Sequence, residues 1–172
     1  MTVRLLAPAE LASRVDDAAT LMGECIDEGA SVGWVLPYDH SDLVHFWRAV
    51  ANRAAAGELV VFCALLDAEL AGIVLLTRSG RPNGPHRAEI QKLLVSPRFR
   101  RQGLGRALMV EAETYAASEG LTLLHLDTAG EDAERLYQSL GWVYAGSIPN
   151  YALDPDGTPH ATALYYRELP PR

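Results

Sequence analysis

Residues 89–105 read EIQKLLVSPRFRRQGLG, a strand-like apolar pattern that runs into a loop rich in arginine and glycine. The strand pattern begins at about Arg87. Gly103 to Glu119 then carries apolar residues at helical spacing, and a second apolar strand pattern follows over 121–127. Strand, loop, helix and strand in this order predict a β-α-β unit, whose two strands are parallel neighbours joined by a right-handed crossover.

The segments on either side of this unit predict a larger mixed sheet. Two apolar stretches, Glu58 to Leu66 and Leu70 to Thr77, are separated by a short polar break and indicate an antiparallel hairpin. We therefore predict a single α/β domain over residues 1–172, with a mixed, mostly antiparallel sheet of six to seven strands, one parallel pair, and helices on both faces. Its further strands are expected over 2–7, 142–148 and 162–169, and its further helices over about 11–26, 40–56 and 132–140.

Composition and charge restrict the class of protein. The chain has 172 residues, 49% of them hydrophobic, which suits one domain with its own core. No apolar run is long enough to span a bilayer and the N-terminus lacks a signal-peptide pattern, so we expect a cytoplasmic protein without a membrane partner. A net charge of −7 argues against a nucleic-acid partner. Neither Cys25 and Cys63 nor His40 and His45 have metal-ligand spacing, so no metal is expected.

The loop inside the β-α-β unit has the features of a phosphate site. Gly103 and Gly105 lie at the first turn of the helix, where backbone N–H groups have no partner within the helix and the helix dipole is positive. Three arginines of the same segment can add charge-assisted hydrogen bonds. The dinucleotide-binding fingerprint is excluded because Leu108 occupies the position of its third glycine. A tight turn without a ligand is the alternative that the glycines alone leave open.

The same stretch carries a family resemblance. Residues 89–97 followed by Arg100-x-x-Gly103-x-Gly105 resemble the central motif of the GNAT superfamily of N-acetyltransferases, and Leu136-Tyr137 with Leu140-Gly141-Trp142 resembles its later signature. The resemblance covers about half of the chain. It implies a GNAT-like fold and acetyl-coenzyme A as the cofactor. The residues that it assigns to cofactor binding are Leu94, Val95, Arg100, Arg101, Gln102, Gly103, Leu104, Gly105 and Arg106.

A second resemblance, to the tabtoxin-resistance acetyltransferases, runs over most of the chain. These enzymes acetylate tabtoxinine-β-lactam, a small antibiotic amino acid. The resemblance therefore implies an antibiotic-resistance type of enzyme that transfers acetyl to the primary amine of a small, amino-acid-like molecule. Its motifs are Gly29-Ala30-Ser31-Val32-Gly33, Pro82-Asn83-Gly84, Arg87-Ala88-Glu89, His125-Leu126-Asp127-Thr128 and Pro155-Asp156-Gly157.

Two carboxylates are placed to activate an amine. Glu89 lies on the first strand of the β-α-β unit and Asp127 ends the second, and both strand ends open on the same edge of the sheet. A carboxylate within reach of the amine, directly or through water, can take its proton. On the second strand, Leu124 and Leu126 share one face, whereas His125 and Asp127 share the other. A structural ion pair or hydrogen-bonded network is the alternative for this polar face.

Resemblance to the GNAT superfamily supplies two further catalytic groups. Tyr137 would be the general acid near the departing thiolate. Its spacing from Ala133 and Leu140 suits helix packing equally well. The backbone N–H of Leu94 would polarise the thioester carbonyl. The sequence leaves open whether Glu89 or Asp127 is the main base.

Two connecting segments are expected to wall the acceptor site, because in GNAT-like folds both border it. One joins the first two helices and the other precedes the last strand. Their acidic and aromatic side chains suit a small cationic amine, with solvated loops and core aromatics as the alternative. The residues predicted to bind the acceptor are Ser31, Val32, Trp34, Tyr38, His125, Tyr151 and His160, with Asp39, Asp154 and Asp156 beside them.

Three hypotheses of function follow. The first is acetyl transfer from acetyl-coenzyme A to a small amine, directly in a ternary complex. The second replaces the acceptor by a protein lysine or an N-terminal amine, which would require an open, shallow groove. The third is a non-catalytic acyl-coenzyme A-binding module. The sequence leaves open the acyl chain length, the physiological acceptor and the oligomeric state, although edge strands of such sheets often pair into homodimers.

Overall fold

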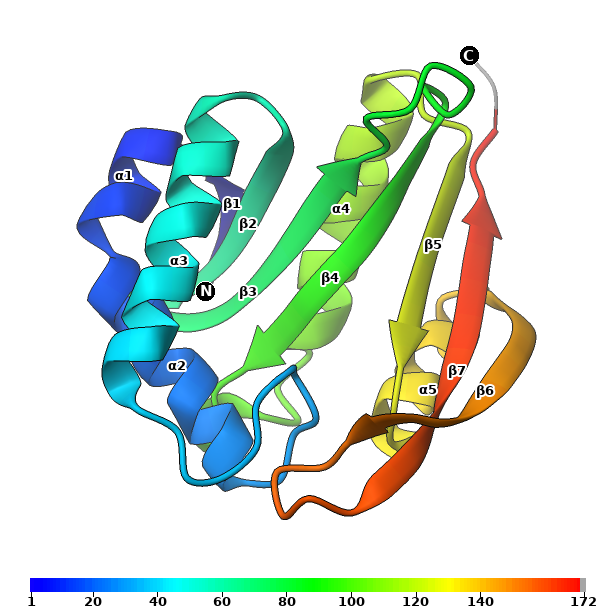
Figure 1. Cartoon of the computed structure of the whole chain (residues 1–172). Coiled ribbons are helices and arrows are strands. Elements are labelled where there is room, and N and C mark those ends of the chain that lie inside the picture. The colour runs from blue at the N-terminus through cyan, green and yellow to red at the C-terminus, as the bar shows by residue number, and fades with distance from the viewer. Residues whose placement is uncertain (171–172) are drawn as a thin grey trace.

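Seven strands and five α-helices make up most of the computed structural model, which describes residues 1–170 (Figure 1). The strands are β1 (Thr2–Leu6), β2 (Leu59–Leu66), β3 (Glu69–Arg78), β4 (Arg87–Val95), β5 (Leu123–Thr128), β6 (Val143–Leu153) and β7 (Pro159–Glu168). The helices are α1 (Pro8–Ser13), α2 (Val15–Asp27), α3 (His40–Ala55), α4 (Leu104–Ser118) and α5 (Glu131–Ser139), and a 3-10 turn spans Pro97–Phe99.

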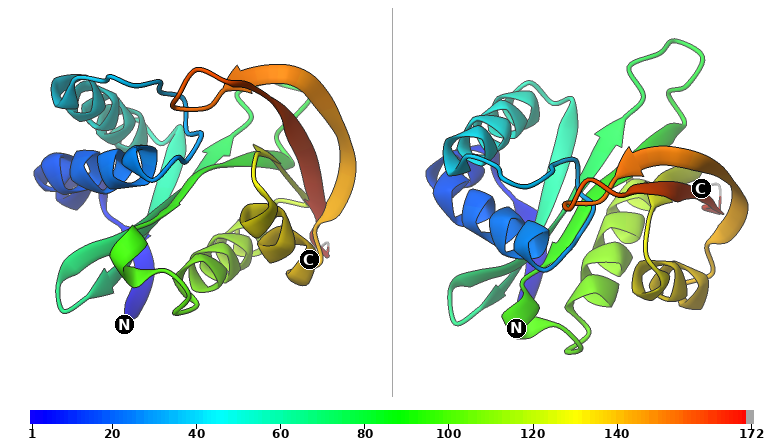
Figure 2. Two further views of the ribbon diagram at one scale, coloured as in Figure 1. Left: turned by 90° about the horizontal axis from the view of Figure 1, so that it is seen from below. Right: turned by 60° about the horizontal axis from the view of Figure 1, so that its bottom comes forward.

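The strands form one sheet in the order β1-β2-β3-β4-β5-β7-β6. Every neighbouring pair is antiparallel except β4 and β5, which are parallel. Helices α1, α2 and α3 cover one face of the sheet, and α4 and α5 cover the other (Figures 1 and 2). The predicted fold class and the β-α-β unit are confirmed. Within residues 1–170, no helix combines the length and the apolar character needed to cross a membrane.

The structure differs from the sequence pattern in two places. The prediction of one helix over 11–26 is wrong, because α1 and α2 meet at Arg14, whose φ of −112° and ψ of 19° are not helical. The final hairpin is also longer than predicted, since β6 and β7 stay paired as far as Leu153 and Pro159. Tyr151 and His160, which the sequence pattern places in a loop, therefore lie in strands.

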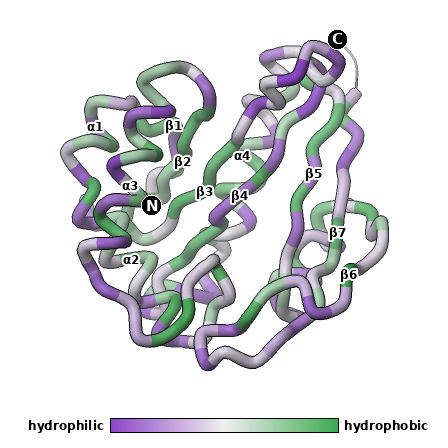
Figure 3. Tube along the Cα trace, in the orientation of Figure 1, coloured by the Kyte–Doolittle hydropathy of each residue, from purple (hydrophilic) through white to green (hydrophobic). Residues whose placement is uncertain are grey.

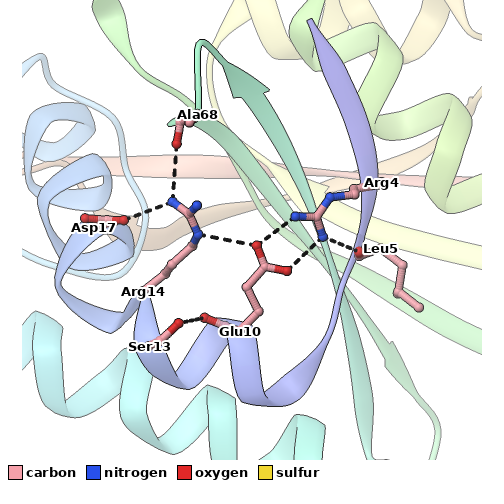
Figure 4. A network of polar contacts seen from close by, with 7 residues as sticks. All are labelled: Arg4, Leu5, Glu10, Ser13, Arg14, Asp17 and Ala68. Atoms are coloured by element: carbon pink, nitrogen blue, oxygen red, sulfur yellow. Dashed lines mark hydrogen bonds and ion pairs between the residues drawn. The ribbon is translucent and has the colours of Figure 1, made fainter.

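Polar contacts surround the break between α1 and α2 (Figure 4). Arg4 of β1 pairs with Glu10 of α1 at 2.7 Å. Arg14 pairs with the same carboxylate at 3.4 Å and with Asp17 at 3.2 Å. It also donates to the carbonyl of Ala68, in the β2–β3 turn, at 3.4 Å. Exposed and half-exposed ion pairs contribute little stability, so the network mainly orients the two helices on the edge strand β1.

Two apolar cores lie on opposite faces of the sheet. The core under α1, α2 and α3 contains Trp47, and the core under α4 and α5 contains Leu108; both side chains are fully buried. Strand β3 contributes to both cores, because Ile73 faces the first and Val74 the second. Figure 3 accordingly shows much of β3 as hydrophobic. Strand β3, buried on both faces, thus lies at the centre of the fold and pairs directly with β4.

Strand β4 is irregular where it separates from β5. Its pairing with β5 ends at Glu89 and His125, after which the two strands diverge (Figure 1). The register between β4 and β3 shifts between Gln91 and Leu94, and Lys92 at this shift has a positive φ of 52°. This β-bulge reorients the second half of β4. In residues 1–170, that half of the strand has β3 as its neighbour on one side and no paired strand on the other.

Asp39 caps α3 and thereby fixes the end of the connection from α2. Its side chain accepts a hydrogen bond from the backbone N–H of Ser41 at 2.8 Å. The variant Asp39→Ala is expected to lower the free energy of unfolding by about 1 kcal/mol, which is typical for the loss of an N-cap. Asp42→Ala, in the first turn of the same helix, is the matched control. Equal losses for the two variants in urea unfolding would contradict the capping role.

Candidate active site

The loop between β4 and α4 leads to a helix start without a capping side chain. Gly103 occupies the N-cap position of α4 with a φ of 82°, and Arg101 before it has a φ of 64°. Among residues 1–170, no side chain caps the first N–H groups of the helix. The N–H groups of Leu104, Gly105 and Arg106 therefore point outward from the positive end of the helix dipole. An anion of the size of a phosphate suits this position.

Arginines surround this helix start. Arg106 donates to Ser139 of α5 at 2.7 Å, which holds its guanidinium beside the loop. Arg101 lies 3.9 Å from Asp132, and both side chains are highly exposed, so this pair leaves the guanidinium free to bind a ligand. Arg100 is exposed as well. Uncapped N–H groups and nearby guanidinium donors suit a pyrophosphate, so the residues present fit the cofactor that the sequence resemblance implies.

The backbone of β4 offers donors on the side where β5 has separated. The N–H of Ser96 bonds the carbonyl of Ala71 in β3 at 2.9 Å. Hydrogen-bonded pairs alternate along an antiparallel ladder, so Leu94 also directs its N–H at β3. The N–H of Val95, between Leu94 and Ser96 in the regular part of the ladder, therefore faces the β5 side. The sequence resemblance assigns the carbonyl-polarising role to the N–H of Leu94, and Val95 is the neighbouring residue whose N–H faces the side where β5 has separated.

Polar side chains occupy the sheet face that α1, α2 and α3 also cover. The two leucines inside β5 are buried in the core under α4 and α5, so His125 and Asp127 lie on the opposite face. Glu89 is the direct strand partner of His125 and shares that face. Asp127 accepts a hydrogen bond from Thr162 of β7 at 3.0 Å through Oδ2. Both predicted carboxylates thus border one face of the sheet, on adjacent strands.

Tyr137 projects from α5 into the core beside this region. Its side chain is 5% exposed, and its ring packs near Trp142 and Tyr165 with centroid distances of 5.9 and 6.1 Å. Burial raises the pKa of the Tyr137 hydroxyl; hydrogen bonding with Thr128 lowers the pKa, and the charge of Asp127 raises it further. The hydroxyl is therefore protonated at neutral pH and able to donate a proton. Packing and a proton-donating role are compatible at this position.

The connection from α2 to α3 meets the tip of the β6–β7 hairpin (Figure 2). The N–H of Leu36 donates to the carbonyl of Pro155 at 2.7 Å. Ser31 Oγ lies 2.7 Å from His160 Nε2 and donates to the carbonyl of Leu153 at 3.2 Å. The two segments that are predicted to wall the acceptor site are therefore in direct contact.

The remaining residues predicted for acceptor binding are not all gathered here. Trp34 packs edge-on against Phe46 of α3, with ring centroids 5.2 Å apart. Tyr38 instead donates to Asp27 at 3.2 Å, at the end of α2. Tyr151 is 54% exposed on β6. Trp34 thus lies against α3, whereas Tyr38 is engaged at the end of α2 and Tyr151 is exposed.

Lys92 is not among the site residues predicted from the sequence, yet it lies beside them. Its ammonium donates to the carbonyl of Val32 at 2.7 Å and lies 5.6 Å from the ring centroid of Phe46. Burial lowers the pKa of Lys92, and the nearby charges of Asp127 and Glu89 oppose that shift. Lys92 is also the only lysine among the fifteen lysines and arginines of the chain. This use of a single lysine, in a chain that otherwise uses arginine, is the one feature of the sequence that could have marked Lys92 as a candidate site residue.

A separate cavity of about 500 Å³ opens between α5 and the β6–β7 hairpin. Glu134 and Gln138 form part of its polar wall through hydrogen bonds of 2.7 and 2.9 Å to Tyr165. Neither Glu89 nor Lys92 lines this cavity. The face that carries the carboxylates is bordered instead by β4, β5 and the α2–α3 connection.

Comparison with known families and proteins gives one family. The profile of the acetyltransferase (GNAT) family matches residues 20–142. An uncharacterized protein of Mycobacterium leprae is 35% identical over 107 residues, which are 61% of this chain and 29% of that protein. The aligned region is thus a minor part of that longer relative.

Solved structures share the fold over nearly the whole chain. A ribosomal-protein-alanine N-acetyltransferase from Brucella melitensis has a TM-score of 0.77 at 19% identity, covering 98% of this chain and 100% of that one. A phosphinothricin acetyltransferase from Sinorhizobium meliloti in complex with acetyl-coenzyme A has a TM-score of 0.78 at 19% identity, covering 98% and 88%. A protein from Salmonella typhimurium, solved with its cofactor acetyl-coenzyme A, has a TM-score of 0.78 at 17% identity, covering 100% of this chain and 95% of that one. At these identities the comparison shows the fold alone.

Proposed function

The chain belongs to the acetyltransferase (GNAT) family, whose cofactor is acetyl-coenzyme A, and from this membership we propose that it acetylates the primary amine of a small, amino-acid-like molecule. The single observation that carries the proposal is the pair of carboxylates, Glu89 and Asp127, on one sheet face where β4 and β5 separate. Tabtoxinine-β-lactam is a specific acceptor to be tested within this class.

The cofactor would be held at two places on β4 and α4. Its pyrophosphate would accept hydrogen bonds from the uncapped N–H groups that follow Gly103 and from Arg100 and Arg101. Bound acetyl-coenzyme A supplies an acetyl group activated as a thioester. The outward N–H of Val95 would bond the adjoining part of the molecule, and a backbone N–H of this part of β4 would polarise the carbonyl.

The amine must lose a proton to become a nucleophile. Glu89 or Asp127 would take that proton, directly or through water. Asp127 is oriented for this by its hydrogen bond from Thr162, which engages Oδ2 and leaves Oδ1 for another partner. Tyr137, kept neutral by burial, would donate a proton to the leaving thiolate. The chain would thus supply both a proton acceptor and a proton donor for the transfer.

The contact between the α2–α3 connection and the β6–β7 hairpin favours a small acceptor over a protein. Ser31 with His160 and Leu36 with Pro155 join the two walls, which reduces the width available to a peptide. The fold alone does not distinguish a small acceptor from a protein acceptor, because the similar structures include both a ribosomal-protein-alanine acetyltransferase and a phosphinothricin acetyltransferase.

Incubation with acetyl-coenzyme A and two sets of acceptors, followed by mass spectrometry, tests the acceptor class. One set contains amino acids, diamines and tabtoxinine-β-lactam, and the other contains peptides with lysine or a free N-terminus. Acetylation confined to the first set is the expected result. Acetylation of the peptides alone would favour the protein acetyltransferase, and tight cofactor binding without any product would favour a non-catalytic module.

The glycine at the start of α4 offers a matched test of the cofactor site. Gly103 and Gly120 flank the two ends of α4, both with positive φ and with open space within 4 Å of the position that a Cβ would take. Alanine at either position costs about 1 to 2 kcal/mol of backbone strain. Gly103→Ala is expected to weaken coenzyme A binding by about tenfold, because relief of that strain turns the helix N–H groups away from the phosphate. Gly120→Ala should leave the calorimetric affinity unchanged, and equal weakening would contradict the assignment.

A further inference from the structure

We propose that the ammonium of Lys92 binds a carboxylate of the acceptor, so that the acceptor is a primary amine that also carries a carboxylate. This inference rests on the proposed function and names its substrate class more closely. It assigns a specificity-determining role to a residue that neither the glycine loop nor the catalytic carboxylates account for.

The bulged backbone at Lys92 directs its side chain toward the acceptor face, which is the face of β4 and β5 that carries Glu89 and Asp127. Lys92 sits in the β4 bulge with a φ of 52°, a conformation that costs a residue other than glycine about 1 to 2 kcal/mol. Its ammonium reaches the α2–α3 connection, where a Cβ on Gly33 would lie 3.4 Å from Nζ. Strained backbone of this kind is retained where the surrounding structure needs the side chain in one place.

The surroundings of Lys92 only partly satisfy its charge. An ammonium has three N–H donors. Within residues 1–170, one of them is bonded to the carbonyl of Val32, and no carboxylate lies within 4.0 Å of Nζ. The ring of Phe46 adds a cation–π contact. Two donors are thus available to an acceptor oxygen in a half-buried setting, where a charge-assisted hydrogen bond is strong.

The charges of this face match those of an amino acid. Glu89 and Asp127 attract the ammonium of the acceptor, and Lys92 attracts its carboxylate. A diamine that lacks this carboxylate would bring only positive charge toward Lys92. The face should therefore select an amine that carries a carboxylate against the corresponding diamine, by repulsion as well as by attraction.

A purely structural role is the competing explanation. Through Val32, Lys92 could serve only to hold the α2–α3 connection against β4. If Lys92 has only this structural role, replacing it should weaken the binding of every acceptor alike. If Lys92 binds a carboxylate, replacing it should weaken only acceptors that have a carboxylate. The two roles therefore predict different results with matched pairs of acceptors.

The presence of one lysine makes a direct test practical. Protein labelled with 13C-lysine gives a single lysine side-chain spin system, and it belongs to Lys92. The coenzyme A-saturated protein is titrated with L-ornithine and putrescine, with L-lysine and cadaverine, and with 2,4-diaminobutyrate and 1,3-diaminopropane. The Lys92 signal is expected to shift with the amino acid of at least one pair, at an affinity about 10- to 100-fold higher than that of its diamine. No shift with any amino acid, or equal affinity within every pair, would overturn the proposal.

Variants separate this proposal from the proposed function. Lys92→Met should raise KM for the preferred carboxylated acceptor by about 10- to 100-fold and change KM for its diamine far less, whereas Lys92→Arg should restore part of the discrimination. Equal increases in KM for the amino acid and its diamine would mean that Lys92 has only a structural role. Failure of the proposed function would appear differently, as the absence of coenzyme A binding or of thiol release in the wild type, and the NMR titration would still report whether Lys92 binds a carboxylate.

Discussion

Replacing both carboxylates of the acceptor face, as Glu89→Gln with Asp127→Asn, is expected to lower kcat by about 10²- to 10⁴-fold, the usual contribution of a general base. Each substitution keeps the shape of the side chain and removes its ability to take a proton. Thr162 can still donate to the side-chain oxygen at position 127, so the fold should persist. An unchanged calorimetric affinity for coenzyme A would verify that the cofactor site is intact.

The two single variants divide the role between the carboxylates. Groups that act as a unit are not additive, so the single variant that reproduces most of the double effect identifies the main base. Asp16→Asn, an exposed carboxylate of α2, is the control for the loss of a charge. A double variant that keeps more than about one tenth of the wild-type kcat would contradict a base role for this face.

The second large effect is expected for Tyr137→Phe, which should lower kcat by about 10²-fold by removing the proton donor for the leaving thiolate. The ring would keep its packing near Trp142 and Tyr165. Tyr115→Phe is the matched control, since the Tyr115 ring packs on Phe62 with a centroid distance of 5.5 Å in the same apolar core. Equal kcat values for wild type and Tyr137→Phe would leave Tyr137 with a packing role only.

The pH dependence of stability tests the burial on which that role depends. Because the folded state raises the pKa of Tyr137, the unfolded chain ionises this tyrosine first, near its ordinary value of about 10. The stability that neutral Tyr137 contributes is present below that pH and is lost as the pH rises toward the raised folded pKa. Tyr137→Phe should therefore reduce the alkaline fall in unfolding free energy, measured in urea above about pH 10. Identical falls in both proteins would contradict the burial of the hydroxyl.

Much of the fold could be predicted from local patterns. The β-α-β unit follows from the strand before Ser96 and the glycines that open α4, because those signals are local. The break at Arg14 could not be predicted, since Leu11 and Val15 are both buried and continue the helical spacing through it. The length of the β6–β7 hairpin could not be predicted from the sequence either, because β6 is mostly exposed and lacks the alternation of a half-buried strand.

The sheet face on which a site residue lies could be predicted where the strand alternates regularly. His125 and Asp127 share a face because β5 is regular. Strand β4 is not regular, because its register with β3 shifts between Gln91 and Leu94 and Lys92 has a positive φ. The same bulge aims Lys92 at the acceptor face. Bulges depend on tertiary pairing and leave little trace in composition, so both features required the structure.

The central claim is that the polar face of β4 and β5 activates an amine for acetyl transfer. Its most direct test is the rate of thiol release from acetyl-coenzyme A in the presence of small amines. Wild type and the Glu89→Gln/Asp127→Asn variant should be measured side by side. The predicted result is amine-dependent release by the wild type, matched by an equal amount of acetylated amine, and its near loss in the variant. Release that is independent of amine, or equal in the two proteins, would contradict the claim.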